Sequence, residues 1–202
     1  MKYFKFIGNI DVSAAIAEVQ ANDHMFGPHT PRPEQSPPLR EGRSIHLRIH
    51  DKHSKTSDIS DAQGAKELAD KMLDAVDNED FFRLPECRKL INLAMTMTLP
   101  GSKLGRCYVA KMSPGGNVYP HIDPGRYFDV HDRYHIVLQT NNGVSFSCGN
   151  NNIPGDVETV RFEANELWVF NNKVMHWASN KGDQDRIHII MDVRNDTLHF
   201  PQ

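Results

Sequence analysis

The sequence contains little cysteine, no long apolar run and no surplus of positive charge. Its three cysteines form no CxxC pair and leave an odd one over, which favours reduced, buried thiols in a reducing compartment. No apolar run is long enough to cross a bilayer, and MKYFKFIGNIDV lacks the apolar core of a secretory signal. We therefore expect a cytoplasmic protein without a membrane partner. The net charge of -3 gives no reason to expect a nucleic-acid partner either.

The composition that remains is that of an ordinary globular protein, with 39% hydrophobic and 24% charged residues among 202. A chain of this length can bury a substantial core, and we expect one domain over residues 1–202. The pattern changes near its middle. We expect strands and supporting helices in residues 1–103 and a β core in residues 104–193.

The N-terminal half alternates short strand patterns with helical ones. Five prolines between Gly27 and Arg43 predict a loop, because proline interrupts both helices and central strands. A capping box at Ser60 opens an apolar stripe of helical period that continues to Val76. The further predictions are strands at 3–7 and 44–50, a helix at about 11–21, and a helix with Pro85 in its first turn.

Residues 104–193 contain no helical stripe, only short runs of two-residue period separated by Gly, Asn, Asp and Pro. Eight short strands with such turns indicate a sandwich, a jelly roll or a barrel. We therefore expect a mainly β fold with flanking helices packed outside an antiparallel core. The eight predicted strands are GRCYVAKM, GNVYPHI, YHIVLQT, VSFSCG, VETVRF, ELWVFN, KVMHWAS and RIHIIMDV.

The stretch YPHIDPG places His121 and Asp123 two residues apart. With 11 histidines and 26 acidic residues in 202, roughly 1.4 such His-x-acid pairs arise by chance. A hydrogen-bonded surface pair therefore explains this spacing well. In a strand, however, residues i and i+2 share a face, so an imidazole and a carboxylate can reach one metal ion.

His176 lies among apolar residues in KVMHWASN, where a buried histidine needs a partner. A satisfied core histidine is the usual outcome for such a residue. Together with His121 and Asp123, however, it completes two histidines and one carboxylate, the facial triad that leaves positions open on Fe(II).

Two further strands place cationic or polar groups on one face. Arg186 shares a face with His188, Ile190 and Asp192, and a buried arginine there needs an anion, which its planar fork binds bidentately. An internal ion pair of Arg186 with Asp192 or Glu166 is the competing explanation. Arg133 and His135 share a face of DRYHIVLQT and suggest a second anion contact.

Four ordered motifs now carry a resemblance. PGGNVYPHIDPG, RYHIVLQTNNGVSF, ELWVFNNKVMHWASN and RIHIIMDV, together covering about 104–193, resemble the aspartyl/asparaginyl β-hydroxylase family of Fe(II)- and 2-oxoglutarate-dependent oxygenases. The resemblance implies a double-stranded β-helix, a cupin-like jelly roll, with the metal at its open end.

The same resemblance implies roles for single residues. His121, Asp123 and His176 would be the metal ligands, and Arg186 would bind the distal carboxylate of 2-oxoglutarate. Arg133 and His135 would help to hold the cosubstrate near its metal-bound end. Asp123 is a departure from the animal members, which lack this carboxylate, and is similar to a bacterial branch that contains proline hydroxylases. A serine that assists the distal carboxylate in the animal enzymes aligns with Ala110.

We therefore expect a dioxygenase that hydroxylates an amino-acid side chain, either in a protein or as a free amino acid such as proline. It would use Fe(II), 2-oxoglutarate and O2, supported by ascorbate, and release succinate and CO2. A cupin-like metal- or carboxylate-binding protein without oxygenase activity is the alternative from another class. A third possibility is that the triad is only hydrogen-bonded.

The substrate and the oligomeric state are not readable from the sequence. Substrate contacts are expected from the loops at 27–43 and 123–132. The candidate lining residues are Tyr127, Phe128, His131 and Trp177, for each of which ordinary packing or solvent exposure is an equal explanation.

Overall fold

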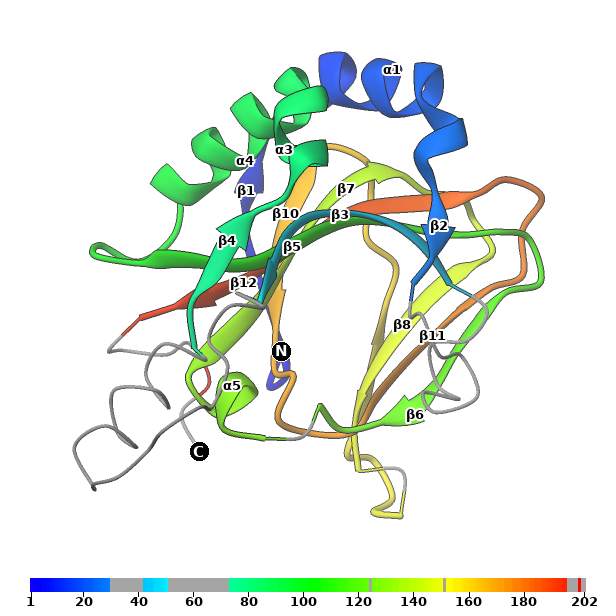
Figure 1. The fold of residues 1–202 in the computed structure, drawn as a ribbon. Helices are drawn as coiled ribbons and strands as arrows, with labels where there is room; N and C mark the ends of the chain where they lie inside the picture. The colour runs from blue at the N-terminus through cyan, green and yellow to red at the C-terminus, as the bar shows by residue number, and fades with distance from the viewer. Residues whose placement is uncertain (30–41, 51–72, 124, 151, 196–199, 201–202) are drawn as a thin grey trace.

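The computed structural model describes residues 1–29, 42–50, 73–123, 125–150, 152–195 and 200, and these build two antiparallel sheets that face each other (Figure 1). The larger sheet contains β1 (Phe4–Asn9), β2 (Gly27–Pro28), β3 (Arg43–His50), β4 (Ala75–Asp77), β5 (Lys103–Met112), β7 (His131–Gln139), β10 (Glu166–Phe170) and β12 (Arg186–Arg194). The smaller sheet contains β6 (Asn117–His121), β8 (Val144–Gly149), β9 (Val157–Val160) and β11 (His176–Asn180).

The eight strands predicted between 104 and 193 are all present, as β5 to β12. Their order is β10-β7-β12-β5 in one sheet and β6-β11-β8-β9 in the other, so the chain crosses repeatedly between the sheets. This order is that of a double-stranded β-helix, and the predicted fold class is confirmed. β1, β3, β4 and β2 extend the larger sheet at its two edges.

Helices cover the outer face of the larger sheet (Figure 1). They are α1 (Ser13–Ala21), the short 3-10 helix η1 (Asp23–Met25), α3 (Glu79–Arg83) and α4 (Pro85–Thr96), while α5 (Arg126–Asp129) lies near the opening between the sheets. Alternation along β12 sends Ile187, Ile189, Met191 and Val193 into the core beneath α1 and α4. Glu18 of α1 accepts hydrogen bonds from the backbone N–H groups of Glu86 and Cys87, which satisfies two free donors at the start of α4.

Three local predictions need correction. Val76, the predicted end of the helix that opens at Ser60, lies in β4, while residues 51–72 are outside the described part. The two ends of the predicted 27–43 loop are paired strands, because Gly27 and Pro28 form an edge strand against Ser44 and Arg43, and an edge tolerates proline. The predicted 123–132 loop contains α5 and the first residues of β7.

The predicted helices at about 11–21 and from Pro85 are present as α1 and α4. All three cysteines are buried, as predicted. No helix in the described residues is both long and apolar enough to span a membrane. The division into an N-terminal part and a β core within one domain stays a prediction.

Candidate metal centre

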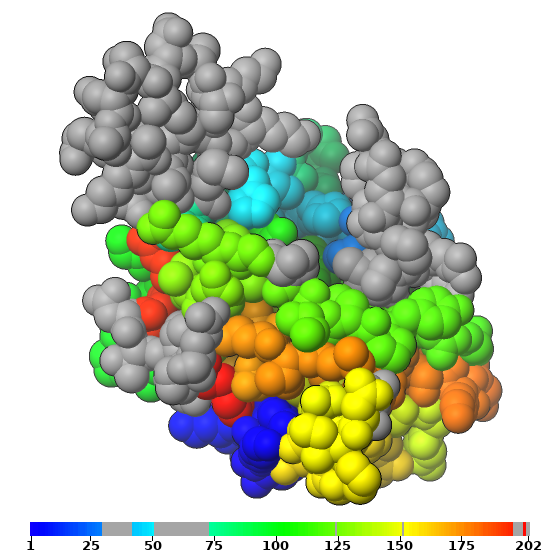
Figure 2. All heavy atoms as spheres, turned by 90° about the horizontal axis from the view of Figure 1, so that it is seen from below, coloured from blue at the N-terminus to red at the C-terminus, as the bar shows by residue number. Residues whose placement is uncertain are grey.

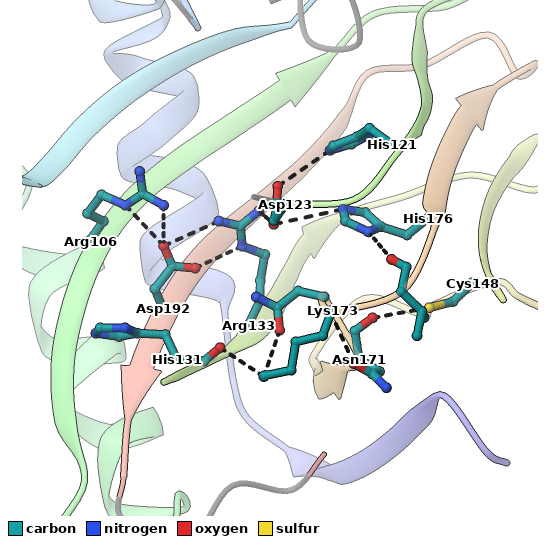
Figure 3. Close-up of polar contacts among 12 residues, drawn as sticks. Arg106, His121, Asp123, His131, Arg133, Cys148, Asn171, Lys173, His176 and Asp192 are labelled. Atoms are coloured by element: carbon teal, nitrogen blue, oxygen red, sulfur yellow. Dashed lines mark hydrogen bonds and ion pairs between the residues drawn. The ribbon is translucent and has the colours of Figure 1, made fainter. Parts of the chain in front are cut away.

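Two neighbouring strands of the smaller sheet bring the predicted metal ligands together. His121 ends β6, His176 begins β11, and the two residues are opposite each other in the antiparallel pairing. Their ring centroids are 4.3 Å apart, and Asp123 follows β6 by two residues. One donor atom from each of the three residues lies within 4.8 Å of the others. The triad therefore forms one cluster at the open end of the β-helix (Figure 3).

Backbone carbonyls orient both imidazoles toward Asp123. Nδ1–H of His121 donates to the carbonyl of Tyr119 (2.8 Å), and Nδ1–H of His176 donates to that of Val174 (2.9 Å). This tautomer leaves both Nε2 lone pairs facing the carboxylate of Asp123, at 3.6 and 3.9 Å. Burial lowers the pKa of His176 to about 4, so this ring is neutral near pH 7. Two imidazoles and a carboxylate are a donor set that suits divalent transition metals.

Arg133 joins this cluster to a second buried carboxylate. Its Nη1 donates to Oδ2 of Asp123 (2.7 Å), and its Nε donates to Oδ1 of Asp192 (2.8 Å). Asp192 is fully buried and also accepts from Nε and Nη2 of Arg106, at 3.2 and 3.1 Å. Burial by itself would raise the pKa of Asp192, but the two guanidinium charges hold it below its usual value.

Arg186 lies on the inner face of β12 in very different surroundings. Its closest polar partners are neutral rings, Nδ1 of His188 at 3.0 Å and Nδ1 of His135 at 3.5 Å. Among the described residues it forms no ion pair, so the internal pair considered with Asp192 or Glu166 is absent there. Burial lowers the pKa of Arg186 to about 10. Its Nε and the Nε2 atoms of both histidines are buried without a partner in the described structure.

Aromatic rings connect the Arg186 region to the metal cluster. The ring centroid of His135 is 5.3 Å from that of Phe170, which in turn is 5.0 Å from that of His176. Phe146 contacts the same two histidines, at 5.4 and 6.3 Å. Packed rings therefore connect Arg186, through His135, to His176 of the candidate triad.

Two cavities open beside these groups. One of about 60 Å³ is lined by Arg186, Ala110 and Asn117, and another of about 280 Å³ is lined by Asp123, Arg133 and Phe128 among others. His29 and Tyr108 line both cavities and separate them. Figure 2 shows the mouth side of the molecule, where α5, β6 and the connection from β10 to β11 meet on one face.

A family comparison can now be added to this geometry. The family model described as Aspartyl/Asparaginyl beta-hydroxylase matches residues 51–196. The chain belongs to this family. The family predicted from the four motifs is confirmed, and the protein is a hydroxylase. A search of curated proteins finds no match.

Solved structures of three oxygenases resemble this hydroxylase in fold. A prolyl hydroxylase from Trichoplax adhaerens, in complex with a hypoxia inducible factor peptide, has a TM-score of 0.58 at 13% identity, covering 97% of this chain and 85% of its own. A 2OG-Fe(II) oxygenase family oxidoreductase from Burkholderia pseudomallei gives 0.55 at 13%, covering 89% and 77%. A Pseudomonas putida prolyl-4-hydroxylase gives 0.52 at 16%, covering 98% and 95%.

Of the residues predicted to line the substrate entrance, only Phe128 borders the larger cavity. Tyr127 and His131 stack on each other at 3.9 Å and are buried, and Trp177 is half-buried in β11. Gly105 makes room for this packing, because a Cβ there would lie 2.5 Å from Oη of Tyr127.

Sequence reasoning missed Arg106 and Tyr108 as cavity residues. Both are on the face of β5 that also presents Ala110 and Met112 to the interior. The signal was available, since the two-residue period of GRCYVAKM assigns these residues to one face. His29 and His46, whose rings lie tilted against that of Tyr108 with centroids 4.8 and 5.9 Å away, gave no comparable signal.

Proposed function

We propose that the protein is an Fe(II)- and 2-oxoglutarate-dependent dioxygenase that hydroxylates an amino-acid side chain and releases succinate and CO2. The observation that carries the proposal is Arg186, a buried cation that forms no ion pair with the described residues and that packed rings connect, through His135 and Phe170, to His176 of the triad. A buried charge without a partner is unfavourable, which suits a site that acquires its anion as a ligand. The triad supplies the other half of that site.

The residues present fit both groups that this function requires. His121, Asp123 and His176 offer three donors with fixed orientation, the number that leaves open positions on Fe(II). For the cosubstrate, Arg186 offers an orphaned Nε and a planar fork that matches a carboxylate bidentately. Ala110 lacks the family's serine hydroxyl, but Tyr108 lines the same small cavity and provides a hydroxyl there.

When bound together, iron, 2-oxoglutarate and O2 supply the oxidative chemistry, a decarboxylation coupled to hydroxylation of a nearby C–H bond. The protein's own side chains bind, orient and exclude water. Burial around Phe146, Phe170 and Ala178 keeps the interior apolar, which strengthens the charge contacts of Arg186. No side chain has to act as a general acid or base in this proposal.

The proposed substrate is an amino-acid side chain, presented in a peptide or as a free amino acid. The cavity of about 280 Å³ next to Asp123 has room for one such side chain and carries the charged walls Arg48, Arg106 and Arg133. Phe128 supplies an aromatic wall. The peptide held by the prolyl hydroxylase of similar fold supports a peptide substrate, and the bacterial branch suggested by Asp123 supports a free amino acid.

The test is an assay with Fe(II), ascorbate and 2-oxoglutarate on the purified protein. We expect succinate to form, and one panel of free amino acids and one of peptides to reveal a product heavier by one oxygen atom. Without oxygen, Fe(II) and 2-oxoglutarate together should give a weak visible charge-transfer band. Metal binding without the band and without succinate would favour the cupin-like binding protein instead.

A further inference from the structure

We propose that Arg133 acts on the metal ligand Asp123 and that its own position is fixed by Asp192. Arg133 is then a positioning residue for the metal, in contrast to the role near the cosubstrate that the family resemblance implies. This inference rests on the proposed metal site. It concerns the four residues Arg106, Asp192, Arg133 and Asp123, which we call the arginine–carboxylate ladder (Figure 3).

The first step is the hydrogen bonding of Arg133. Each of its three guanidinium nitrogens donates to a carboxylate: Nη1 to Asp123 at 2.7 Å, Nε to Asp192 at 2.8 Å and Nη2 to Asp192 at 3.3 Å. The guanidinium therefore bridges the two acids, as charge-assisted donors in a planar fork can do. The side chain is buried, which strengthens these charge-assisted bonds.

The second step is the rigidity of the anchor. Asp192 on β12 lies directly opposite Arg133 on β7 in the antiparallel pairing, so the backbone of the sheet fixes their separation. Arg106 binds the same carboxylate from β5. The guanidinium carbon of Arg106 also lies 4.2 Å from the ring centroid of Tyr127 and 4.7 Å from that of Phe128. Asp192 is thus held from two strands.

The third step is the effect on Asp123. This residue follows β6 and has no strand pairing of its own to orient its side chain. The bond from Arg133 occupies Oδ2, while Oδ1 lies 3.6 Å from Nε2 of His121. Arg133 therefore fixes the rotation of the carboxylate and leaves Oδ1 free for a cation. Hydrogen-bonded outer residues of this kind commonly change metal affinity by about 10–100-fold.

The fourth step is the charge balance. The formal charges of the two arginines and the two aspartates in the ladder cancel, and Arg133 pairs with both aspartates. To bind a cosubstrate carboxylate, Arg133 would have to release a buried anion. Arg186 has no such anion to release among the residues that the structure describes. The geometry thus favours Arg133 as the residue that positions Asp123 and Arg186 as the residue that binds the cosubstrate carboxylate.

The test measures the affinity for Mn(II) alone, without 2-oxoglutarate, in Arg133→Lys and Asp192→Asn. We expect both variants to lose about 10–100-fold in metal affinity, because lysine lacks the planar fork that fixes the geometry of both acids and asparagine weakens the anchor. Asp132→Asn is the matched control, since Asp132 is equally buried and pairs with Lys173 at 3.0 Å, away from Asp123. The control should retain the wild-type affinity for Mn(II).

The outcomes separate the ladder from the proposed function. Unchanged Mn(II) affinity in both variants, with weaker 2-oxoglutarate binding, would assign Arg133 to the cosubstrate and overturn the inference. An equal loss of Mn(II) affinity in Asp132→Asn would show that general destabilisation explains the loss in all three variants, and this too would overturn the inference. If the wild-type protein binds no divalent metal, the proposed function itself is wrong. Should Arg133→Lys not fold, Asp192→Asn decides alone.

Discussion

Two buried arginines on neighbouring strands face the same interior and differ in what they contact. Arg133 donates to two carboxylates, whereas the polar contacts of Arg186 among the described residues are with the neutral rings of His135 and His188. The charge of Arg133 is therefore already balanced by carboxylates of the protein, without any ligand. The Arg186 region has a positive charge in excess and three buried polar atoms without partners in the described structure. The difference supports the proposal that Arg133 holds the structure together and that Arg186 binds the carboxylate of a ligand.

The largest expected effect lies at the metal, beside the Arg133 region. His176→Ala removes one of three donors, and we expect succinate formation and Mn(II) affinity to fall by more than the ~100-fold of an outer-shell change. His24→Ala, an exposed histidine in η1, is the matched control and should behave as wild type. Retained turnover in His176→Ala would exclude this histidine as a ligand.

The second prediction compares the two arginines directly through stability. Arg133→Leu leaves two buried carboxylates short of a partner, and we expect it to lower the free energy of unfolding by about 3–5 kcal/mol. Arg186→Leu removes a buried cation that has no ion pair, and we expect little change or a gain. Urea unfolding without metal or cosubstrate measures both. An equal loss of unfolding free energy in the two variants would show that the two arginines do not differ in their contribution to stability.

The third prediction concerns the pH at which each of the two regions loses its contribution to stability. Burial, with a smaller effect of the Arg186 charge, lowers the pKa values of His135 and His188 well below 6.5. As the pH falls, these two histidines take up protons in the unfolded chain before they do so in the folded protein. The stability that the neutral rings contribute is therefore present above about pH 6.5 and is lost as the pH falls below it. The pKa of Asp192 is lowered from 3.8, so its contribution persists until the pH falls below that value.

Unfolding free energies measured between about pH 6.5 and 4.5 check this separation. In His188→Asn, which cannot titrate, we expect the slope to decrease by up to ~1.4 kcal/mol per pH unit. Asp192→Asn should keep the wild-type slope in this range, although its stability is lower throughout. A wild-type slope in His188→Asn would mean that this ring titrates normally.

The strands and the clustering of the candidate ligands were predictable because both depend on local patterns. Alternation over short runs located β5 to β12, and the two-residue spacing of His121 and Asp123 explains how their side chains reach one cluster. The end of the predicted helix at Val76 was wrong, because apolar residues at helical spacing also fit the short strand β4 there. Local pattern alone does not distinguish the two.

The partners of the arginines were not predictable, because strand pairing decides them. Asp192 shares a face of β12 with Arg186 and was considered as its partner, but six residues of strand separate the two by roughly 20 Å. The pairing of β12 with β7 instead places Asp192 opposite Arg133. The shared face of β12 therefore identified Asp192 correctly as the acid of a buried ion pair, but it assigned this acid to Arg186 instead of Arg133. The register of the sheet pairs Arg133 with Asp192 and leaves Arg186 without an ion pair among the described residues.

The smallest expected effect comes from removing a single hydroxyl group near Arg186. Tyr108 lines both cavities and sits two residues before Ala110 on β5, so Tyr108→Phe should weaken 2-oxoglutarate binding about tenfold, the scale of one hydrogen bond to a carboxylate. Tyr134→Phe, on the helix-facing side of β7, should leave this affinity unchanged. A weaker affinity for the substrate alone in Tyr108→Phe would assign the hydroxyl to the larger cavity. Arg186 would then bind its carboxylate without help from this strand.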